Sequence, residues 1–174
     1  MSDRQWPDGD CPLCPRLVEF RQTMRGRHPE WFNRPVPSFG PDDARLLVVG
    51  LAPGLKGANR TGRPFTGDFA GEILYPALHA VGLTRGAFDP DGRDDLTLVD
   101  CRITNAVRCV PPANKPTGAE IQTCRRFLAE ELLVGPRPHG QPRTLRCVVG
   151  EQRVEHGRRD DAVANVGDDV QRLG

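Results

Sequence analysis

The chain has 174 residues, a formal net charge of +1 and 37% hydrophobic residues, a length that suits one domain with a substantial core. No stretch approaches the ~20 apolar residues of a membrane span, and the acidic amino terminus does not resemble a secretion signal. We therefore expect a cytoplasmic protein. The near-zero charge excludes a globally basic surface, so any contact with nucleic acid must come from a local patch.

The apolar pattern predicts three elements in the first half of the chain. A short helix is expected after Pro15, and it ends near Gly26. The continuous apolar run at residues 45–51 predicts a buried strand. Residues 69–82 predict a helix whose inward face carries Ile73, Leu74, Ala77, Leu78 and Val81.

Three further elements are expected in the second half. The β-branched run at residues 96–107 predicts a second strand, and residues 144–150 predict a third. Between them lies a helix that begins after Thr117, with Glu120 three residues later in a capping box. Strands that alternate with helices predict an α/β fold with a mostly parallel sheet.

A glycine-rich loop, residues 50–68, joins the first strand to the helix that follows it. This order places the loop at the carboxyl edge of the sheet, where open α/β folds bind ligands. Its glycines at positions 50, 54, 57 and 62 allow tight turns and close approach of the backbone to a ligand. No Gly-Lys-Ser/Thr follows and GxGxxG is absent, so neither common phosphate-binding loop is present.

Six cysteines in a chain without a secretion signal argue against a disulfide framework. Cys11 and Cys14 have the two-residue spacing of paired metal ligands, and Cys109 and Cys124 could complete a set of four. Such a set binds zinc or an iron–sulfur cluster, and the spacing does not choose between them. The remaining two, Cys101 and Cys147, lie in apolar runs and are expected to be buried small hydrophobes.

Three segments carry a resemblance to a known family: PVPSFG at 35–40, GLAPGLKGANRTGRPFTGD at 50–68 and TNAVRCVPPANKP at 104–116. They resemble the family 5 (UdgB-type) uracil-DNA glycosylases over roughly residues 10–150. Ala52 favours this family over family 4, which has a glutamate at the corresponding position. The resemblance implies a three-layer α/β/α fold with a central mostly parallel sheet, in one domain over residues 1–150. It also implies a [4Fe-4S] cluster on Cys11, Cys14, Cys109 and Cys124.

The resemblance further implies roles for residues of the motifs. Asp68 and Asn105 are expected in catalysis, the aspartate as water activator or support for the sugar cation. Because Asp68 precedes a helix, it also suits an N-cap. Phe65 offers a face for a flipped base, with a core aromatic as the alternative, and one amide such as Asn105 can read two adjacent positions of a uracil edge. The other expected base-binding residues are Gly50, Ala52, Pro53 and Asn59.

The implied activity is removal of uracil from DNA, and of other deaminated bases such as hypoxanthine or xanthine, by hydrolysis of the N-glycosidic bond. The partner is DNA containing such a base, and we expect a monomer. Affinity for DNA should come mainly from phosphate contacts. The cations that flank the motif loops are expected to make them: Lys56, Arg60, Arg63, Arg108 and Lys115.

Residues 151–174 form a divergent, highly charged tail without a strand-like run. The family continues here with a His-Pro-Ser-type motif that this tail lacks, so we expect a truncated or frameshifted gene product. Two alternatives remain open at this point. One is a catalytically impaired relative that binds DNA only, and the other is a zinc-ribbon module that binds nucleic acid without catalysis.

Overall fold

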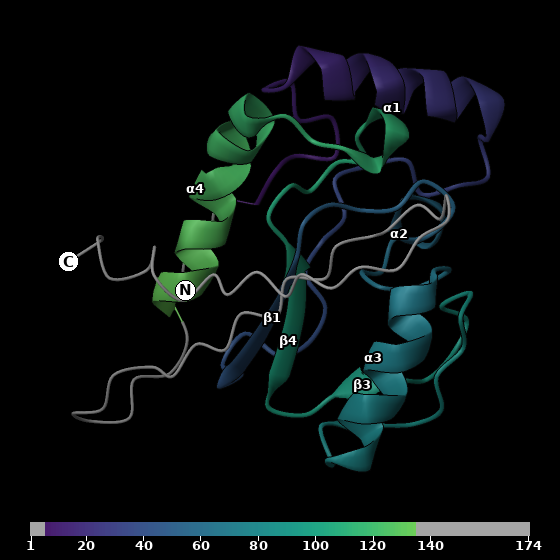
Figure 1. Ribbon diagram of the computed structural model, residues 1–174, viewed down its shortest axis with the longest axis vertical. Helices are drawn as coiled ribbons and strands as arrows, with labels where there is room; N and C mark the ends of the chain where they lie inside the picture. Colours follow the sequence, from purple (N-terminus) through teal and green to yellow (C-terminus); the bar gives the residue numbers. More distant parts are fainter. Residues whose placement is uncertain (1–5, 135–174) are drawn as a thin grey trace, which may run out of the picture.

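The computed structural model describes residues 6–134 (Figure 1). The expected strand at 144–150, Cys147 and the tail lie outside these residues. Within residues 6–134, no helix is both long and apolar enough to cross a bilayer. The elements, in chain order, are α1 (Pro15–Arg27), β1 (Leu46–Gly50), α2 (Ala58–Thr61), α3 (Phe69–Ala80), β2 (Thr84–Arg85), β3 (Thr97–Leu98), β4 (Cys101–Asn105), a 3-10 turn η1 (Pro112–Asn114) and α4 (Gly118–Val134).

Two parallel strands form the centre of the described fold. β1 pairs with β4 in a register that sets Leu46 opposite Cys101 and Gly50 opposite Asn105. Phe39 forms an antiparallel bridge to Ile103 of β4, and β2 pairs with β3 in a separate antiparallel ribbon. The parallel pair, with helices on both sides of it, confirms the expected α/β class.

The expected strand at residues 96–107 is wrong as a single element, because the chain forms β3 and then β4 with a break between them. The break lies at Asp100, which has a φ of 54°. The Asp100 carboxylate accepts a hydrogen bond from the backbone N–H of Arg45 at 2.8 Å and also pairs with the Arg45 guanidinium. These contacts at the start of β1 hold a left-handed conformation that ends β3.

Helix α3 covers one face of the β1–β4 pair, with the expected Leu74 and Leu78 packed inwards and the other three expected side chains turned to solvent. Tyr75 and Leu78 are buried against Val48 and Ile103, whereas Ile73 and Val81, together with Ala77, face solvent. The reason is the tyrosine hydroxyl, which donates a buried hydrogen bond to the Pro64 carbonyl at 2.7 Å. The large aromatic ring of Tyr75 therefore joins Leu74 and Leu78 on the inward face, and the rest of the predicted stripe faces solvent.

A second core cluster lies between α1, α4 and the segment that follows β4; it consists of Leu17, Val107, Cys109, Cys124 and Phe127. The capping box at the start of α4 is confirmed. Thr117 N–H donates to the Glu120 carboxylate at 2.7 Å, and Glu120 N–H donates to the Thr117 hydroxyl at 3.3 Å. The expected buried position of Cys101 is also confirmed.

Candidate active site

The carboxyl ends of β1 and β4 bring Gly50 and Asn105 side by side. Asn105 is 4% exposed, and its side-chain amide makes none of the hydrogen bonds between residues 6–134. A Cβ at Gly50 would collide with Asn105 Oδ1 and lie 2.9 Å from Cζ of Phe65. Gly50 therefore lets the Asn105 amide and the Phe65 ring approach the same point of the backbone.

Gly50→Ala is expected to lower the free energy of unfolding by about 1–3 kcal/mol, because the methyl group overpacks the contact with Phe65 and Asn105. Chemical denaturation followed by tryptophan fluorescence measures the loss. Gly26→Ala is the matched control, since a Cβ at Gly26 meets nothing within 4 Å. Equal stability of the two variants would contradict the close approach at Gly50.

Phe65 holds an unusual backbone conformation for an aromatic residue, with a φ of 56°. A left-handed conformation of this kind costs about 1–3 kcal/mol and persists only where surrounding contacts enforce it. The ring is half-buried and packs against the core under α3, so the core-aromatic interpretation holds for part of its surface. Strained residues of this kind concentrate at functional sites.

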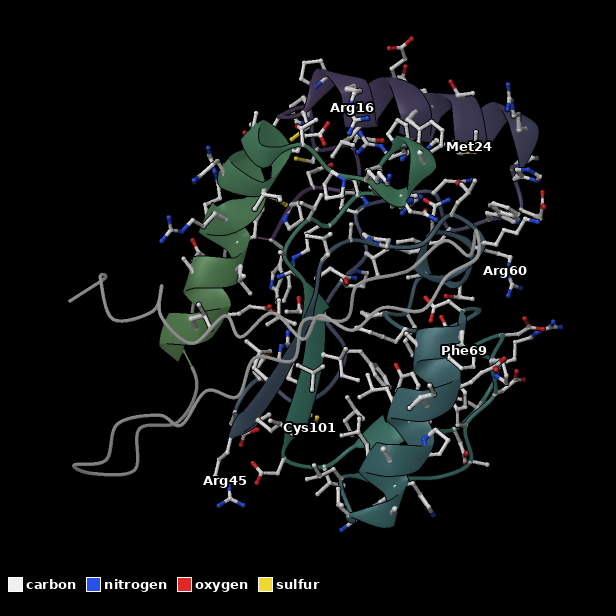
Figure 2. All side chains as sticks on the ribbon, in the orientation of Figure 1. Arg16, Met24, Arg45, Arg60, Phe69 and Cys101 are labelled. Carbon is white, nitrogen blue, oxygen red and sulfur yellow. The ribbon has the colours of Figure 1, made fainter. Side chains whose placement is uncertain are left out.

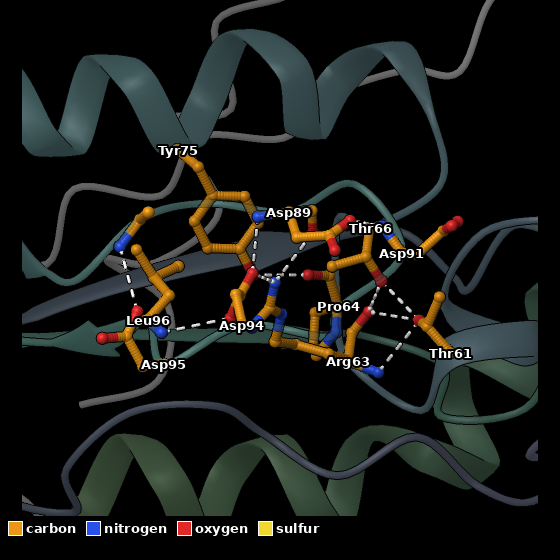
Figure 3. Close-up of polar contacts among 11 residues, drawn as sticks. Thr61, Arg63, Pro64, Thr66, Tyr75, Asp89, Asp91, Asp94, Asp95 and Leu96 are labelled. Carbon is orange, nitrogen blue, oxygen red and sulfur yellow. Dashed lines mark hydrogen bonds and ion pairs between the residues drawn. The ribbon is translucent and has the colours of Figure 1, made fainter.

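A buried ion pair fixes the loop around Phe65 (Figure 3). Arg63 donates two hydrogen bonds to the Asp94 carboxylate at 2.6 and 2.7 Å, and its guanidinium lies 5.3 Å from the centroid of the Tyr75 ring. Asp94 also accepts the N–H groups of Asp89 at 2.6 Å and Leu96 at 3.1 Å. Its hydrogen bonds to Arg63 lower the pKa of Asp94 to about 2.

The expectation that Arg63 contacts phosphate is corrected by this geometry, because its charge is engaged inside the protein. The connection between α3 and β3 thus holds the glycine-rich loop in place. The polar, turn-rich sequence of this connection did not indicate that role. A backbone hydrogen bond from Gly67 N–H to the Pro90 carbonyl at 2.7 Å adds a second tie between the same two segments.

Tyr75→Phe is expected to cost about 1–2 kcal/mol of unfolding free energy, because the buried carbonyl of Pro64 loses its donor while the ring is retained. Urea denaturation monitored by circular dichroism measures this change. If the variant is as stable as the wild type, the hydrogen bond to Pro64 does not hold the loop.

Asp68 is the N-cap of α3, which is one of the two roles that the sequence predicted for it. Its side chain accepts the Gly71 N–H at 3.0 Å. The other carboxylate oxygen faces Gly57, where an added Cβ would lie 3.1 Å from it. Asp68 is half-exposed, so the cap fixes its backbone and leaves it at the surface of the loop. Figure 2 shows Phe69, the next residue, towards the opposite end of the strands from Arg45 and Cys101.

The other predicted base-binding residues lie deeper in the loop. Asn59 is buried and donates to Asn33 Oδ1 at 2.9 Å, while its own Oδ1 has no partner among the described residues. Pro53 is fully buried, and Ala52 packs against the core cluster that contains Cys109. The structure therefore brings Gly50, Phe65 and Asn105 together. Ala52, Pro53 and Asn59 lie in the core of the loop behind them.

The remaining predicted phosphate contacts divide by exposure. Arg108 is 1% exposed and pairs with Glu131 at 2.8 Å, so the expectation of a phosphate contact is corrected for it as well. Lys56 and Lys115 are exposed. Arg60 is half-exposed beside Asp91 at 2.7 Å, and Figure 2 shows it at the surface near the start of α3.

The four predicted metal-binding cysteines, Cys11, Cys14, Cys109 and Cys124, line one cavity between α1 and α4. Two N–H groups point at their sulfurs: Arg21 Nη1 lies 3.5 Å from Cys109 Sγ, and Arg108 N lies 3.4 Å from Cys124 Sγ. Burial raises the pKa of the Cys109 thiol to about 12. In the described part, no three His, Cys, Asp or Glu side chains are already placed to ligate one metal ion.

The sequence did not identify Arg21 as a residue of the cysteine-lined cavity. Arg21 lies on the inner side of α1 and lines this cavity together with the four cysteines. It occupies the buried stripe of Leu17 and Met24 at spacings of four and three residues. This spacing is the signal that could have found it, because a charged residue within an apolar helical stripe is rarely buried without a partner.

Together these features define an α/β protein with a candidate ligand site at the carboxyl edge of its parallel strands, and with a cavity that four cysteines line. The sequence model of the uracil DNA glycosylase superfamily matches residues 37–156. The chain therefore belongs to the uracil DNA glycosylase superfamily.

Individual relatives agree with this assignment. The chain is 52% identical over 128 residues to the type-5 uracil-DNA glycosylase of Thermus thermophilus, covering 70% of this chain and 58% of that protein. It is 48% identical over 128 residues to the type-5 enzyme of Mycobacterium leprae, covering 70% and 56%. A type-4 uracil-DNA glycosylase of Pyrobaculum aerophilum is 35% identical over 130 residues, covering 74% and 53%. The chain thus spans little more than half the length of these relatives.

Proposed function

We propose that this chain carries the base-recognition site of a DNA glycosylase that removes uracil by hydrolysis of the N-glycosidic bond. The observation that carries the proposal is the convergence of Asn105 and Phe65 over Gly50. A base that leaves the helix needs a flat apolar face and a polar reader for its edge. Phe65 provides the face, and the Asn105 amide provides one donor and one acceptor for adjacent positions of uracil.

Asp68 is the proposed acidic group of the reaction. Water adds to the sugar carbon as the bond to the base breaks, which yields free uracil and an abasic site without cleavage of the strand. A carboxylate beside the sugar supports the developing positive charge or accepts a proton from the water. The hydrogen bond from Gly71 N–H fixes one oxygen of Asp68 and thereby orients the other.

Contacts with DNA are proposed for the cations that remain at the surface of the motif loops, Lys56, Arg60 and Lys115. Phosphate contacts of this kind set affinity and its salt dependence, whereas base contacts set specificity. We also propose that other deaminated bases, hypoxanthine and xanthine, are substrates. This extension rests on the resemblance to family 5 described above.

The cofactor proposed for the cysteine-lined cavity is a [4Fe-4S] cluster held by Cys11, Cys14, Cys109 and Cys124. Four thiol groups around one cavity, with two N–H groups directed at sulfur, fit a thiolate-ligated centre. When bound, the cluster supplies a cross-link between the amino-terminal segment and α4. Binding energy of this kind contributes directly to folding.

The test is excision from a double-stranded oligonucleotide that carries one uracil, hypoxanthine or xanthine. We expect free base from the wild type and a loss of about 10²-fold or more in rate for Asp68→Ala and Asn105→Ala. Asp43→Asn, a change at an exposed position, is the control and should retain the wild-type rate. If the wild type releases no base from any of the three substrates while it still binds DNA, the catalytic proposal fails. Iron, sulfide and zinc analysis of the purified protein identifies the cofactor separately.

A further inference from the structure

Three arginines are buried in the described part of the chain, and they differ in how their charge is balanced. Arg102 and Arg108 share the carboxylate of Glu131, at 3.1 and 2.8 Å. Arg21, which is 2% exposed, has no carboxylate within ion-pair distance among residues 6–134. The nearby acid Asp10 is engaged by Arg25 at 2.5 Å and faces solvent.

The contacts of Arg21 lead to the cysteines instead. Its Nη1 donates to Cys109 Sγ at 3.5 Å and its Nη2 donates to the Cys11 carbonyl at 3.0 Å. Its Nε is buried without a partner in the described region. The same guanidinium lines the cavity that all four cysteines line, and most of the other lining residues are apolar. A positive charge and four cysteines therefore line the same cavity.

A buried charge in such surroundings is costly, because burial removes its hydration and the two hydrogen bonds to neutral acceptors replace only part of it. The cost is offset if a negative charge occupies the cavity. Neutral thiols do not supply that charge. Four cysteine thiolates around a metal centre do, because they carry more negative charge than the core they hold.

We propose that Arg21 is the counter-ion of a thiolate-ligated metal centre in this cavity and controls its retention and its reduction potential. The proposal rests on the cofactor part of the proposed function. Arg21 acts through charge and through its N–H···S contact, so it is a positioning residue and not a metal ligand. Hydrogen bonds to sulfur and nearby positive charge both favour the reduced, more negative centre, and thus raise its potential.

The experiment compares the wild type with Arg21→Gln and Arg21→Lys, all purified without oxygen. Three quantities are measured: iron and sulfide per chain, the rate at which visible absorbance is lost in a chelator, and the midpoint potential at an electrode. We expect Arg21→Gln to hold less iron, to lose it severalfold faster and to have a more negative potential. Arg21→Lys keeps the charge, so its iron content should approach the wild-type value.

Arg27→Gln, at an exposed position in the last turn of the same helix, is the matched control and should equal the wild type in all three measurements. If Arg21→Gln does not fold, Arg21→Lys is the test variant. We then expect it to contain as much iron as the wild type and to have a shifted midpoint potential, because its contact to sulfur is altered. If both Arg21 variants retain iron as the wild type does and have the wild-type midpoint potential, the counter-ion role is rejected. The cluster proposal itself is not affected by that result.

The wild-type protein separates this inference from the cofactor proposal. If it contains zinc, the cluster proposal is wrong, and the counter-ion role is tested by the rate of zinc loss to a chelator, which should rise in Arg21→Gln. If it takes up neither iron nor zinc after reconstitution, both the cofactor and the counter-ion role are rejected. Excision of uracil is measured independently, so neither outcome is confused with failure of the glycosylase activity.

Discussion

Glu131→Gln is expected to lower the free energy of unfolding by about 3–5 kcal/mol, the cost of removing one partner from a buried ion pair. Glu131 receives hydrogen bonds from Arg102 at 3.1 Å and from Arg108 at 2.8 Å, and its side chain is 2% exposed. Glutamine leaves Arg108 in the interior without a counter-charge, and it leaves Arg102 with only its ion pair to the exposed Asp42 at 3.0 Å. Because Arg102 belongs to β4 and Glu131 to α4, the loss should loosen the contact between this helix and the sheet.

Urea denaturation monitored by circular dichroism measures the effect. Glu19→Gln, on the exposed side of α1, is the control and should change stability by no more than about 0.5 kcal/mol. Burial by itself raises the pKa of Glu131, but Arg108 and Arg102 hold it below its ordinary value. A Glu131→Gln protein as stable as the control would mean that the two arginines find other partners or are hydrated.

Asp94→Asn is expected to cost about 3 kcal/mol, the lower end of the range for a broken buried pair, because asparagine retains part of the hydrogen bonding. The pair with Arg63 holds the loop that carries Phe65, so the variant should also excise uracil more slowly if the proposed activity is present. Asp43→Asn, at an exposed site in the loop before β1, provides the comparison.

The same carboxylate predicts a pH dependence with a definite sign. Its pKa falls from an ordinary value of 3.8 to about 2 in the folded protein, because of its hydrogen bonds to Arg63. As the pH falls, the Asp94 carboxylate is therefore protonated in the unfolded chain before it is protonated in the folded protein. The stabilisation by its pair with Arg63 is fully present above the pKa of the unfolded state. It is lost as the pH falls through 3.8 towards 2. Unfolding free energies of the wild type and Asp94→Asn should converge over this interval, and a constant difference would contradict the assignment.

Much of the fold could be predicted from the sequence because the signals were local. The apolar run at 45–51, the reciprocal pair Thr117 and Glu120, and the order of strand, glycine-rich loop and helix depend on neighbours in the chain. The structure bears out β1, the capping box and the α/β class. The inward face of α3 was predicted only in part. Leu74 and Leu78 pack inwards as expected, but Tyr75 was missed because the buried acceptor that it uses comes from Pro64 in the preceding loop.

The motifs in the sequence placed the chain in its superfamily and selected the residues of the candidate site. Tertiary structure alone decided which of them meet. It set Asn105 and Phe65 against Gly50, and it turned Arg63 and Arg108 from expected phosphate contacts into buried partners of Asp94 and Glu131. The physical reason is that a charge is recognised in a sequence by its residue type, whereas its role depends on burial and on partners that are distant in the chain.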